Sequence, residues 1–227
     1  MGLKNHYATL HNSTLSTVRK EGFSLDVELN NPNDRRRGLT LLLRPNPTIL
    51  KALNGFISEG RTVLSGQYFY PPSDLHLTIM PIISCYEGFS LEKLDLSVYD
   101  QLIKNSLKGI RKIEIKFEGV FASPSCLMVK GFPLNEYLKN FRQNLRESFA
   151  TSNVEQSLDK RYKLVAAHST LVRFTKPIED IDKVFSLIDA YKNFNFGTQY
   201  FDQVTLVYND WYQRESIVKT LNSYPLH

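Results

Sequence analysis

The chain has 227 residues, of which 42% are hydrophobic and 22% are charged. This length fits one large domain or two small lobes, and the composition excludes a chain that is disordered throughout. The formal net charge of +5 favours an anionic ligand such as a phosphate or a nucleic acid.

The first half of the chain predicts an N-terminal extension followed by a domain. Residues 1–33 are polar and irregular, so we expect residues 1–36 to form an extension, partly helical and loosely packed, ahead of a single bilobal domain at 37–227. Apolar runs typical of strands and apolar stripes at helical spacing follow. Strands are expected at residues 39–43, 75–83 and 112–118, helices at 49–57 and 96–107, and a loop or strand edge at 67–72.

The second half repeats this order of elements. After a turn at residues 123–125, strands are expected at 126–129, 164–174 and 204–208, helices at 134–149 and 178–191, a polar loop at 152–161 and a turn at 209–210. Strand, helix, loop and strand therefore occur twice, with almost no residue identity between the halves. We expect an α+β fold of two pseudo-symmetric lobes.

The last strand of each repeat carries the same short motif. One residue separates His76 from Thr78 in the first repeat, and one residue separates His168 from Thr170 in the second. Side chains alternate along a strand, so the two members of each pair face the same side. If the two strands meet between the lobes, two imidazoles and two hydroxyls converge on one cavity.

This set of groups suits chemistry at a phosphodiester. A neutral imidazole takes a proton from water or a ribose hydroxyl, and a protonated one gives a proton to the departing oxygen. The histidine pKa of about 6.5 allows both forms near neutral pH. Threonine hydroxyls donate to the phosphate oxygens as charge develops there. The chain has neither a carboxylate cluster nor a glycine-rich phosphate loop, so we expect no metal and no cofactor.

With these motifs and this order of elements, residues 37–225 resemble the two-histidine (2H) phosphoesterases, which include the LigT-like 2′,5′-RNA ligases and the cyclic phosphodiesterases. The resemblance implies a bilobal α+β fold in which two antiparallel-rich sheets flank a central cleft and helices lie outside. It implies metal-independent action on 2′,3′-cyclic phosphates or on 2′–5′ or 3′–5′ RNA linkages. Transferred by motif, His76 and His168 are the acid–base pair, and Thr78 and Thr170 bind the phosphate.

The second motif also matches the family at Arg173, where the resemblance implies an arginine that approaches the phosphate. Strict alternation puts Arg173 on the opposite strand face from His168, so this role requires a bend or a bulge. The first motif departs from the RNA ligase-like members, which often place a base-stacking aromatic shortly after it. Pro81 and Ile82 stand there instead.

Aromatic residues near the two motifs are further candidates for the substrate site. Tyr68 and Tyr70 precede the first motif and are candidates to stack on a base. Tyr208, Trp211 and Tyr212 are expected to pack in the core rather than line the cleft.

The charged runs at residues 35–37 and 159–161 are expected to be solvated surface. The two cysteines, Cys85 and Cys126, are not in metal-ligand spacing and indicate plain buried thiols in a reducing compartment. Apolar runs are far shorter than the ~18 residues of a membrane span, and the N-terminus lacks the apolar stretch of a signal peptide. We therefore expect a cytoplasmic monomer without a membrane or an obligate protein partner.

The motifs together predict a metal-independent phosphodiesterase that hydrolyses the 2′,3′-cyclic phosphate of a nucleotide or an RNA end. A 2′,5′-RNA ligase or a 2′–5′ phosphodiesterase would use the same residues, so the sequence does not separate these activities. A non-catalytic nucleotide- or RNA-binding module is the alternative from another class. Both motifs are intact, which favours an enzyme over such a module.

Overall fold

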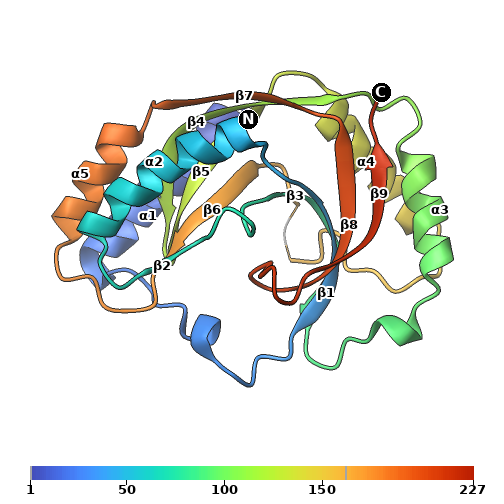
Figure 1. Ribbon diagram of the computed structural model, residues 1–227, viewed down its shortest axis with the longest axis horizontal. Coiled ribbons are helices and arrows are strands. Elements are labelled where there is room, and N and C mark those ends of the chain that lie inside the picture. Colours follow the sequence, from blue (N-terminus) through green and yellow to red (C-terminus); the bar gives the residue numbers. More distant parts are fainter. Residues whose placement is uncertain (1, 162) are drawn as a thin grey trace.

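Two antiparallel sheets form the frame of the protein in the computed structural model, which describes residues 2–161 and 163–227 (Figure 1). Sheet A has the order β3-β1-β8-β9 and contains β1 (Arg37–Leu43), β3 (Leu77–Tyr86), β8 (Gln203–Asp210) and β9 (Lys219–Pro225). Sheet B has the order β2-β6-β5-β4-β7 and contains β2 (Tyr68–Phe69), β4 (Ile113–Ser123), β5 (Cys126–Pro133), β6 (Ala167–Arg173) and β7 (Asn195–Phe201). The α+β architecture of two antiparallel sheets is therefore confirmed.

Two of the helices, α2 (Pro47–Val63) and α4 (Tyr137–Ala150), pack against the sheet of the opposite half of the chain. The others are α1 (Leu3–Glu21), α3 (Leu96–Ser106) and α5 (Ile181–Tyr191), with short 3₁₀ turns η1 (Val27–Asn30) and η2 (Leu91–Lys93). Helix α2 follows β1 of sheet A but packs against β6 and β7 of sheet B, whereas α4 follows β5 of sheet B and packs against α3 and β3 (Figure 1). The large hydrophobic core extends over both sheets, and a smaller cluster lies beneath α1 around Tyr7.

Side-chain caps explain where α2 and α5 begin. The Asn46 side chain accepts a hydrogen bond from the Ile49 amide at 3.0 Å, and Pro47 follows at the first helical position of α2. Asp180 caps α5 in the same way by accepting from the Lys183 amide at 3.0 Å. The helix predicted at 178–191 therefore begins three residues later than expected, at Ile181. The helix predicted at 134–149 also begins three residues later, at Tyr137, where no side chain caps it.

Strands β4, β7 and β9 and the end of β8 depart from the predicted strands. Strand β4 runs on to Ser123, and β7 and β9 had no clear apolar pattern in the sequence because most residues of β9 are exposed or half-buried. The turn predicted at 209–210 is wrong. Strand β8 continues to Asp210, which pairs with Arg37 of β1 and is fully buried.

The N-terminal extension is firmly packed, so the expectation of loose packing is wrong. The Tyr7 side chain is 2% exposed, and its hydroxyl donates to the Gly131 carbonyl at 3.2 Å and accepts from the Ala167 amide at 3.1 Å. Its ring lies 5.0 Å from that of Phe121. Only a few residues of α1 are buried, which explains why its apolar pattern is weak in the sequence.

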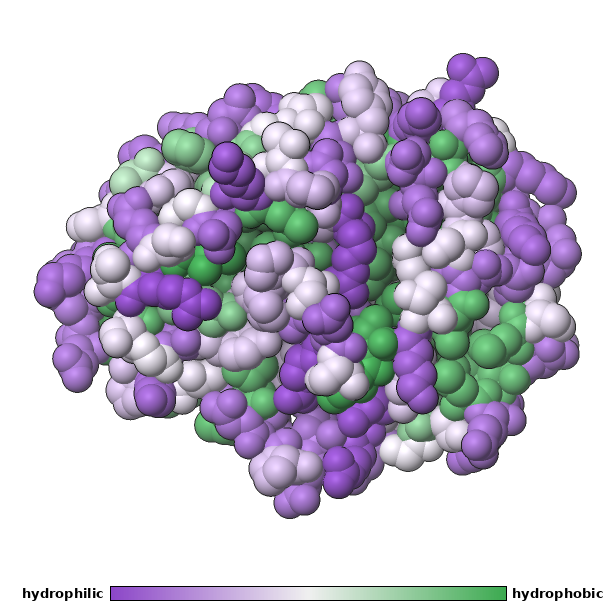
Figure 2. All heavy atoms as spheres, viewed as in Figure 1, coloured by the Kyte–Doolittle hydropathy of each residue, from purple (hydrophilic) through white to green (hydrophobic). Residues whose placement is uncertain are grey.

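In residues 2–161 and 163–227, no helix has a stretch long and apolar enough to cross a lipid bilayer. Hydrophilic side chains cover most of the face seen in Figure 2, and the apolar side chains show in several separate patches.

Candidate active site

The two motif strands bring their polar side chains to one cleft between the sheets. Strands β3 and β6 contact each other, and a cavity of about 340 Å³ lies against them. His76, Thr78, His168 and Thr170 all line this cavity. The convergence of two imidazoles and two hydroxyls that the paired motifs predicted is therefore present in the structure.

A β-bulge in β6 turns Arg173 into the same cleft. Thr170 pairs with Met128 and Val172 pairs with Leu127, so Leu171 is the extra residue of the strand. The bulge shifts the alternation by one position, and Arg173 lines the cavity together with Thr170. The bend or bulge that the role of Arg173 required is present at Leu171.

Strand β3 carries the same irregularity at the equivalent position. Thr78 pairs with Leu42 and Met80 pairs with Leu41, so Ile79 is the extra residue. Pro81 then faces the cavity at the position that Arg173 holds in the second motif. The duplicated architecture therefore extends to the backbone, but only the second copy supplies a cation there.

Arg142 of α4 ties the two motif strands together. Its guanidinium donates to the carbonyls of Thr78 and Ile79 in sheet A at 2.9 and 2.8 Å. It also donates to the carbonyls of Val165 and Ala166, just before β6, at 3.0 and 2.8 Å. The residue is 3% exposed, so this clamp holds the relative position of the two motifs from inside the protein.

The His76 ring is held in one tautomer by the backbone. Its Nδ1 lies 2.7 Å from the carbonyl oxygen of Asp74, and since a carbonyl only accepts, Nδ1 carries the proton. The Nε2 atom of the neutral ring therefore carries the lone pair. Burial lowers the pKa of His76 to about 4, and the Asp74 carbonyl acts against this shift.

His168 lies in a less polar environment. Its Nδ1 is buried and has no hydrogen-bond partner within the described part of the chain. The centres of the His168 and Phe121 rings lie 6.2 Å apart, and the two rings are nearly perpendicular. Burial lowers the pKa of His168 to about 4, and the nearby Arg142 adds to the shift. Both imidazoles are therefore neutral at pH 7 in the ligand-free cleft.

Arg173 is fixed by two side chains from distant segments. Its Nε donates to the Tyr70 hydroxyl at 2.9 Å, and its Nη1 donates to Asp26 Oδ2 at 2.9 Å. Asp26 Oδ1 in turn accepts from the Tyr212 hydroxyl at 2.7 Å. The N-terminal extension thus takes part in the site through Asp26.

The structure separates the two candidate tyrosines. Tyr70 lines the cavity but is 2% exposed, so it presents its hydroxyl to Arg173 rather than a free ring face. Tyr68 packs edge-on against Tyr70 at 5.2 Å and is not among the described residues that line the cavity. Of the C-terminal aromatics, Tyr208 and Tyr212 pack as expected, but Trp211 lines the cleft and corrects the expectation of a core position.

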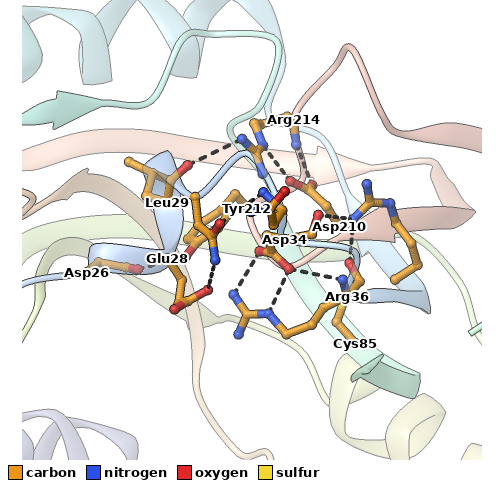
Figure 3. Close-up of polar contacts among 12 residues, drawn as sticks. Asp26, Glu28, Leu29, Asp34, Arg36, Cys85, Asp210, Tyr212 and Arg214 are labelled. Atoms are coloured by element: carbon orange, nitrogen blue, oxygen red, sulfur yellow. Dashed lines mark hydrogen bonds and ion pairs between the residues drawn. The ribbon is translucent and has the colours of Figure 1, made fainter. Parts of the chain in front are cut away.

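Ion pairs order the turn after β8 and the segment before β1. Figure 3 shows the Asp34 carboxylate bound to the backbone amide and the guanidinium of Arg36, and Asp210 beside Arg214. The Nη2 atom of Arg36 lies 2.8 Å from Asp34 Oδ2, and Nε of Arg214 lies 2.6 Å from Asp210 Oδ2. Arg36 is therefore bound within the fold, while Arg35 is exposed.

The polar loop expected to be solvated also reaches the cavity. Asp159 and Arg161 line it, and Asp159 pairs with Arg146 of α4. Cys85 lines the cavity as well, and burial raises the pKa of its thiol to about 12, which leaves it protonated at neutral pH. Among residues 2–161 and 163–227, no group of three or more His, Cys, Asp or Glu side chains is placed to hold a metal ion.

Two of the site's supporting residues were missed in the sequence. Arg142 lies on the apolar stripe of its helix between Phe141 and Leu145, and a charge in that position was a usable signal. Asp26 stands in an irregular segment without any pattern, and only its tertiary contacts show its role.

No family model matches the chain, and no curated protein matches its sequence. Solved structures do match its fold. The Agrobacterium tumefaciens protein of unknown function ATU0111 has a TM-score of 0.60 at 12% identity and covers 91% of this chain and 97% of its own. The Thermus thermophilus protein TT0787 has a TM-score of 0.59 at 17% identity, with coverages of 83% and 97%.

E. coli LigT, crystallised with 3′-AMP, has a TM-score of 0.55 at 14% identity and covers 84% of this chain and 98% of its own. At such identities the likeness shows the fold alone. The protein therefore has the LigT-like fold, and the α+β fold of two antiparallel sheets expected from the sequence is confirmed.

Proposed function

We propose that the protein is a phosphodiesterase that opens the 2′,3′-cyclic phosphate of a nucleotide or an RNA end with His76 and His168. The observation that carries this proposal is the convergence of two imidazoles, two threonine hydroxyls and one arginine on a single cleft. The shared fold supports it, since LigT has been crystallised with 3′-AMP, ATP and phosphate. All groups required for acid–base catalysis at a phosphate come from the chain itself.

The bound phosphate itself favours the protonated histidine that the reaction needs as its acid. Both histidines have a pKa of about 4 in the ligand-free protein. An anion between the rings favours the charged form and raises the pKa of the ring that it contacts. Binding therefore converts one imidazole into an imidazolium, and the pair then holds one acid and one base at neutral pH.

The different surroundings of the two rings assign their roles. The Asp74 carbonyl stabilises a positive charge on His76, whereas His168 Nδ1 has no such partner among the described residues. We assign His76 as the general acid and His168 as the general base. His168 takes a proton from water as its oxygen bonds to phosphorus, the bond to the 2′ or 3′ oxygen breaks in line, and His76 protonates that oxygen.

The remaining groups hold the phosphate while its charge increases. Thr78 and Thr170 line the same cavity and donate hydroxyl hydrogens to the non-bridging oxygens. Arg173 offers charge-assisted hydrogen bonds beside them, with its orientation set by Tyr70 and Asp26.

A substrate panel tests the proposal. The purified protein is incubated, with EDTA present, with the four 2′,3′-cyclic mononucleotides and with a short RNA ending in a cyclic phosphate. Products are resolved against 2′- and 3′-phosphate standards, with His76→Ala alongside. The proposal expects turnover that survives EDTA and is lost in the variant, and the product identifies the bond that breaks. Equal turnover by both proteins would overturn it.

The alternatives are separated by extending the same panel. A 2′–5′ linked dinucleotide and a pair of RNA ends complementary for joining are added as substrates. Turnover of these alone would establish the linkage phosphodiesterase or ligase instead. Binding of nucleotide without turnover of any substrate would establish the non-catalytic module.

A further inference from the structure

Three residues at alternate positions form one wall of the cleft beyond the motifs. Asn209 is the last but one residue of β8, and Trp211 and Gln213 lie in the turn that follows. All three line the cavity that contains the two histidines. The proposed chemistry uses none of them.

This wall carries polar atoms that the fold does not satisfy. The carbonyl oxygens Asn209 Oδ1 and Gln213 Oε1 are buried, and neither has a hydrogen-bond partner among residues 2–161 and 163–227. Asn209 and Gln213 are 2% and 3% exposed. Buried polar groups are almost always paired, because an unpaired acceptor is destabilising. Two such acceptors on one wall of a cleft indicate hydrogen bonds that a ligand completes.

The backbone at Gln213 supports the same conclusion. Its φ of 60° lies in the left-handed region, which is uncommon for a residue other than glycine. Asp210 Oδ1 accepts from the Arg214 amide at 2.9 Å and Asp210 Oδ2 lies 2.6 Å from Arg214 Nε, so the residues on either side of this turn are tied together (Figure 3). Such backbone outliers cluster at functional sites.

The wall adjoins the place proposed for the phosphate. Tyr212 lies between Trp211 and Gln213 in sequence, and the Arg173 guanidinium carbon lies 5.2 Å from the centre of its ring. A phosphate held by the two motifs and Arg173 therefore has these residues as neighbours. Because the wall residues line the same cavity as the two motifs and Arg173, a mononucleotide bound there through its phosphate can place its base against them.

Trp211 supplies the flat surface that a base requires. It is half-buried, and the guanidinium carbon of Arg161 lies 4.8 Å from the centre of its ring. Arg161 is exposed and also lines the cavity. A base can therefore displace the Arg161 guanidinium from the indole face or stack next to that guanidinium. Indole and guanidinium planes are the surfaces on which bases stack.

We infer that Asn209, Trp211 and Gln213 form a nucleobase subsite that selects bases with an exocyclic amino group over uracil. The indole stacks on the base, and the two carbonyl oxygens each accept one hydrogen of its exocyclic amino group. Uracil presents a single N–H to this wall and leaves one acceptor unpaired. The inference rests on the proposed function for its phosphate position and names the end of the substrate that the wall recognises.

The test measures binding of product-like probes rather than turnover. Calorimetry gives the affinities of 3′-AMP, 3′-UMP and inorganic phosphate for the whole protein, for Trp211→Ala and for Gln213→Met. Gln143→Met, on the exposed face of α4, is the matched control for the amide loss. Thermal unfolding of each variant shows that it folds.

The wild-type protein is expected to bind 3′-AMP about 10-fold more tightly than 3′-UMP. Trp211→Ala should weaken 3′-AMP binding by about 10-fold to 100-fold and leave inorganic phosphate unchanged. Gln213→Met should bring the two nucleotides close to equal affinity, and Gln143→Met should change neither.

Equal affinities of the two nucleotides in the wild-type protein would overturn the inference even if cyclic phosphates are turned over. The same holds if Trp211→Ala binds 3′-AMP as tightly as the wild type. If base preference is present but no substrate is turned over, the proposed function fails and the subsite stands. The two claims are therefore decided by different measurements.

Discussion

Thr170 and Arg173 face the same cleft because Leu171 is an extra residue in β6. Without the bulge, a spacing of three along a strand would place them on opposite faces. The bulge converts a regular strand into one that presents an imidazole, a hydroxyl and a guanidinium to one cleft. This arrangement makes Arg173 the residue whose change should act on phosphate binding most directly.

Arg173→Gln should weaken phosphate binding. The change removes the charge-assisted hydrogen bonds that we assign to the phosphate, each worth about 1.5–3 kcal/mol, so inorganic phosphate should bind about 10-fold to 100-fold more weakly. Calorimetry with phosphate measures this directly. Arg111→Gln, at an exposed position ahead of β4, is the control and should bind as the wild type does. Unchanged affinity in Arg173→Gln would remove the arginine from the site.

Asp26→Asn should act on the same property from the N-terminal extension. The carboxylate holds Arg173 at 2.9 Å, and both side chains are mostly buried, at 13% and 15% exposed. Its neutral replacement keeps the shape but loses the ion pair, so we expect a lower melting temperature and phosphate binding weakened by about 3-fold to 10-fold. Asp182→Asn on the exposed side of α5 is the comparison. If Asp26→Asn has the same melting temperature and phosphate affinity as the wild type and as Asp182→Asn, the role of Asp26 is refuted.

Arg142→Leu should destabilise the whole protein. Two backbone carbonyls of β3 and two from the residues just before β6 accept hydrogen bonds from this buried guanidinium. Their loss leaves buried acceptors unpaired, and we expect the free energy of unfolding to fall by about 3–5 kcal/mol. Urea unfolding measures the change. A fall below about 1 kcal/mol would show that the clamp contributes little.

Stability should decrease as the pH falls below neutral. Both motif histidines have a folded-state pKa of about 4, below the unfolded value of about 6.5, so the unfolded chain binds more protons between these limits. Their contribution is fully present above pH ~6.5 and is lost progressively toward pH ~4. His168→Gln removes one such group, and the loss of stability between pH 7 and pH 5 should be smaller in this variant. An identical loss in both proteins would contradict the assigned pKa shift.

The sequence predicted the fold through elements whose burial follows a regular period. The stripe of Ile49, Leu53 and Phe56 predicted α2 because a helix with one buried face leaves that signature. The paired motifs predicted the cleft because two equal motifs in a repeated architecture occupy equivalent positions. Strands such as β9, exposed along most of its length, left no comparable pattern.

Features fixed by tertiary contacts lay beyond the sequence pattern. Asp26 has no neighbours in sequence that mark it, yet it bonds to Arg173 and Tyr212, 147 and 186 positions away. Trp211 looked like a core residue because tryptophan usually is one, but the turn after β8 places it at the cleft. The exchange of α2 and α4 between the sheets likewise depends on long-range packing.

The most direct test of the central claim compares His76→Ala, His168→Ala and the double variant in single-turnover hydrolysis of a 2′,3′-cyclic mononucleotide. If the two imidazoles act together on one phosphate, each single variant should lose about 10²-fold to 10⁴-fold in rate, and the double variant should be little worse than either. Thermal unfolding, measured alongside, shows that each variant folds. Wild-type rates in either single variant would contradict the two-histidine mechanism.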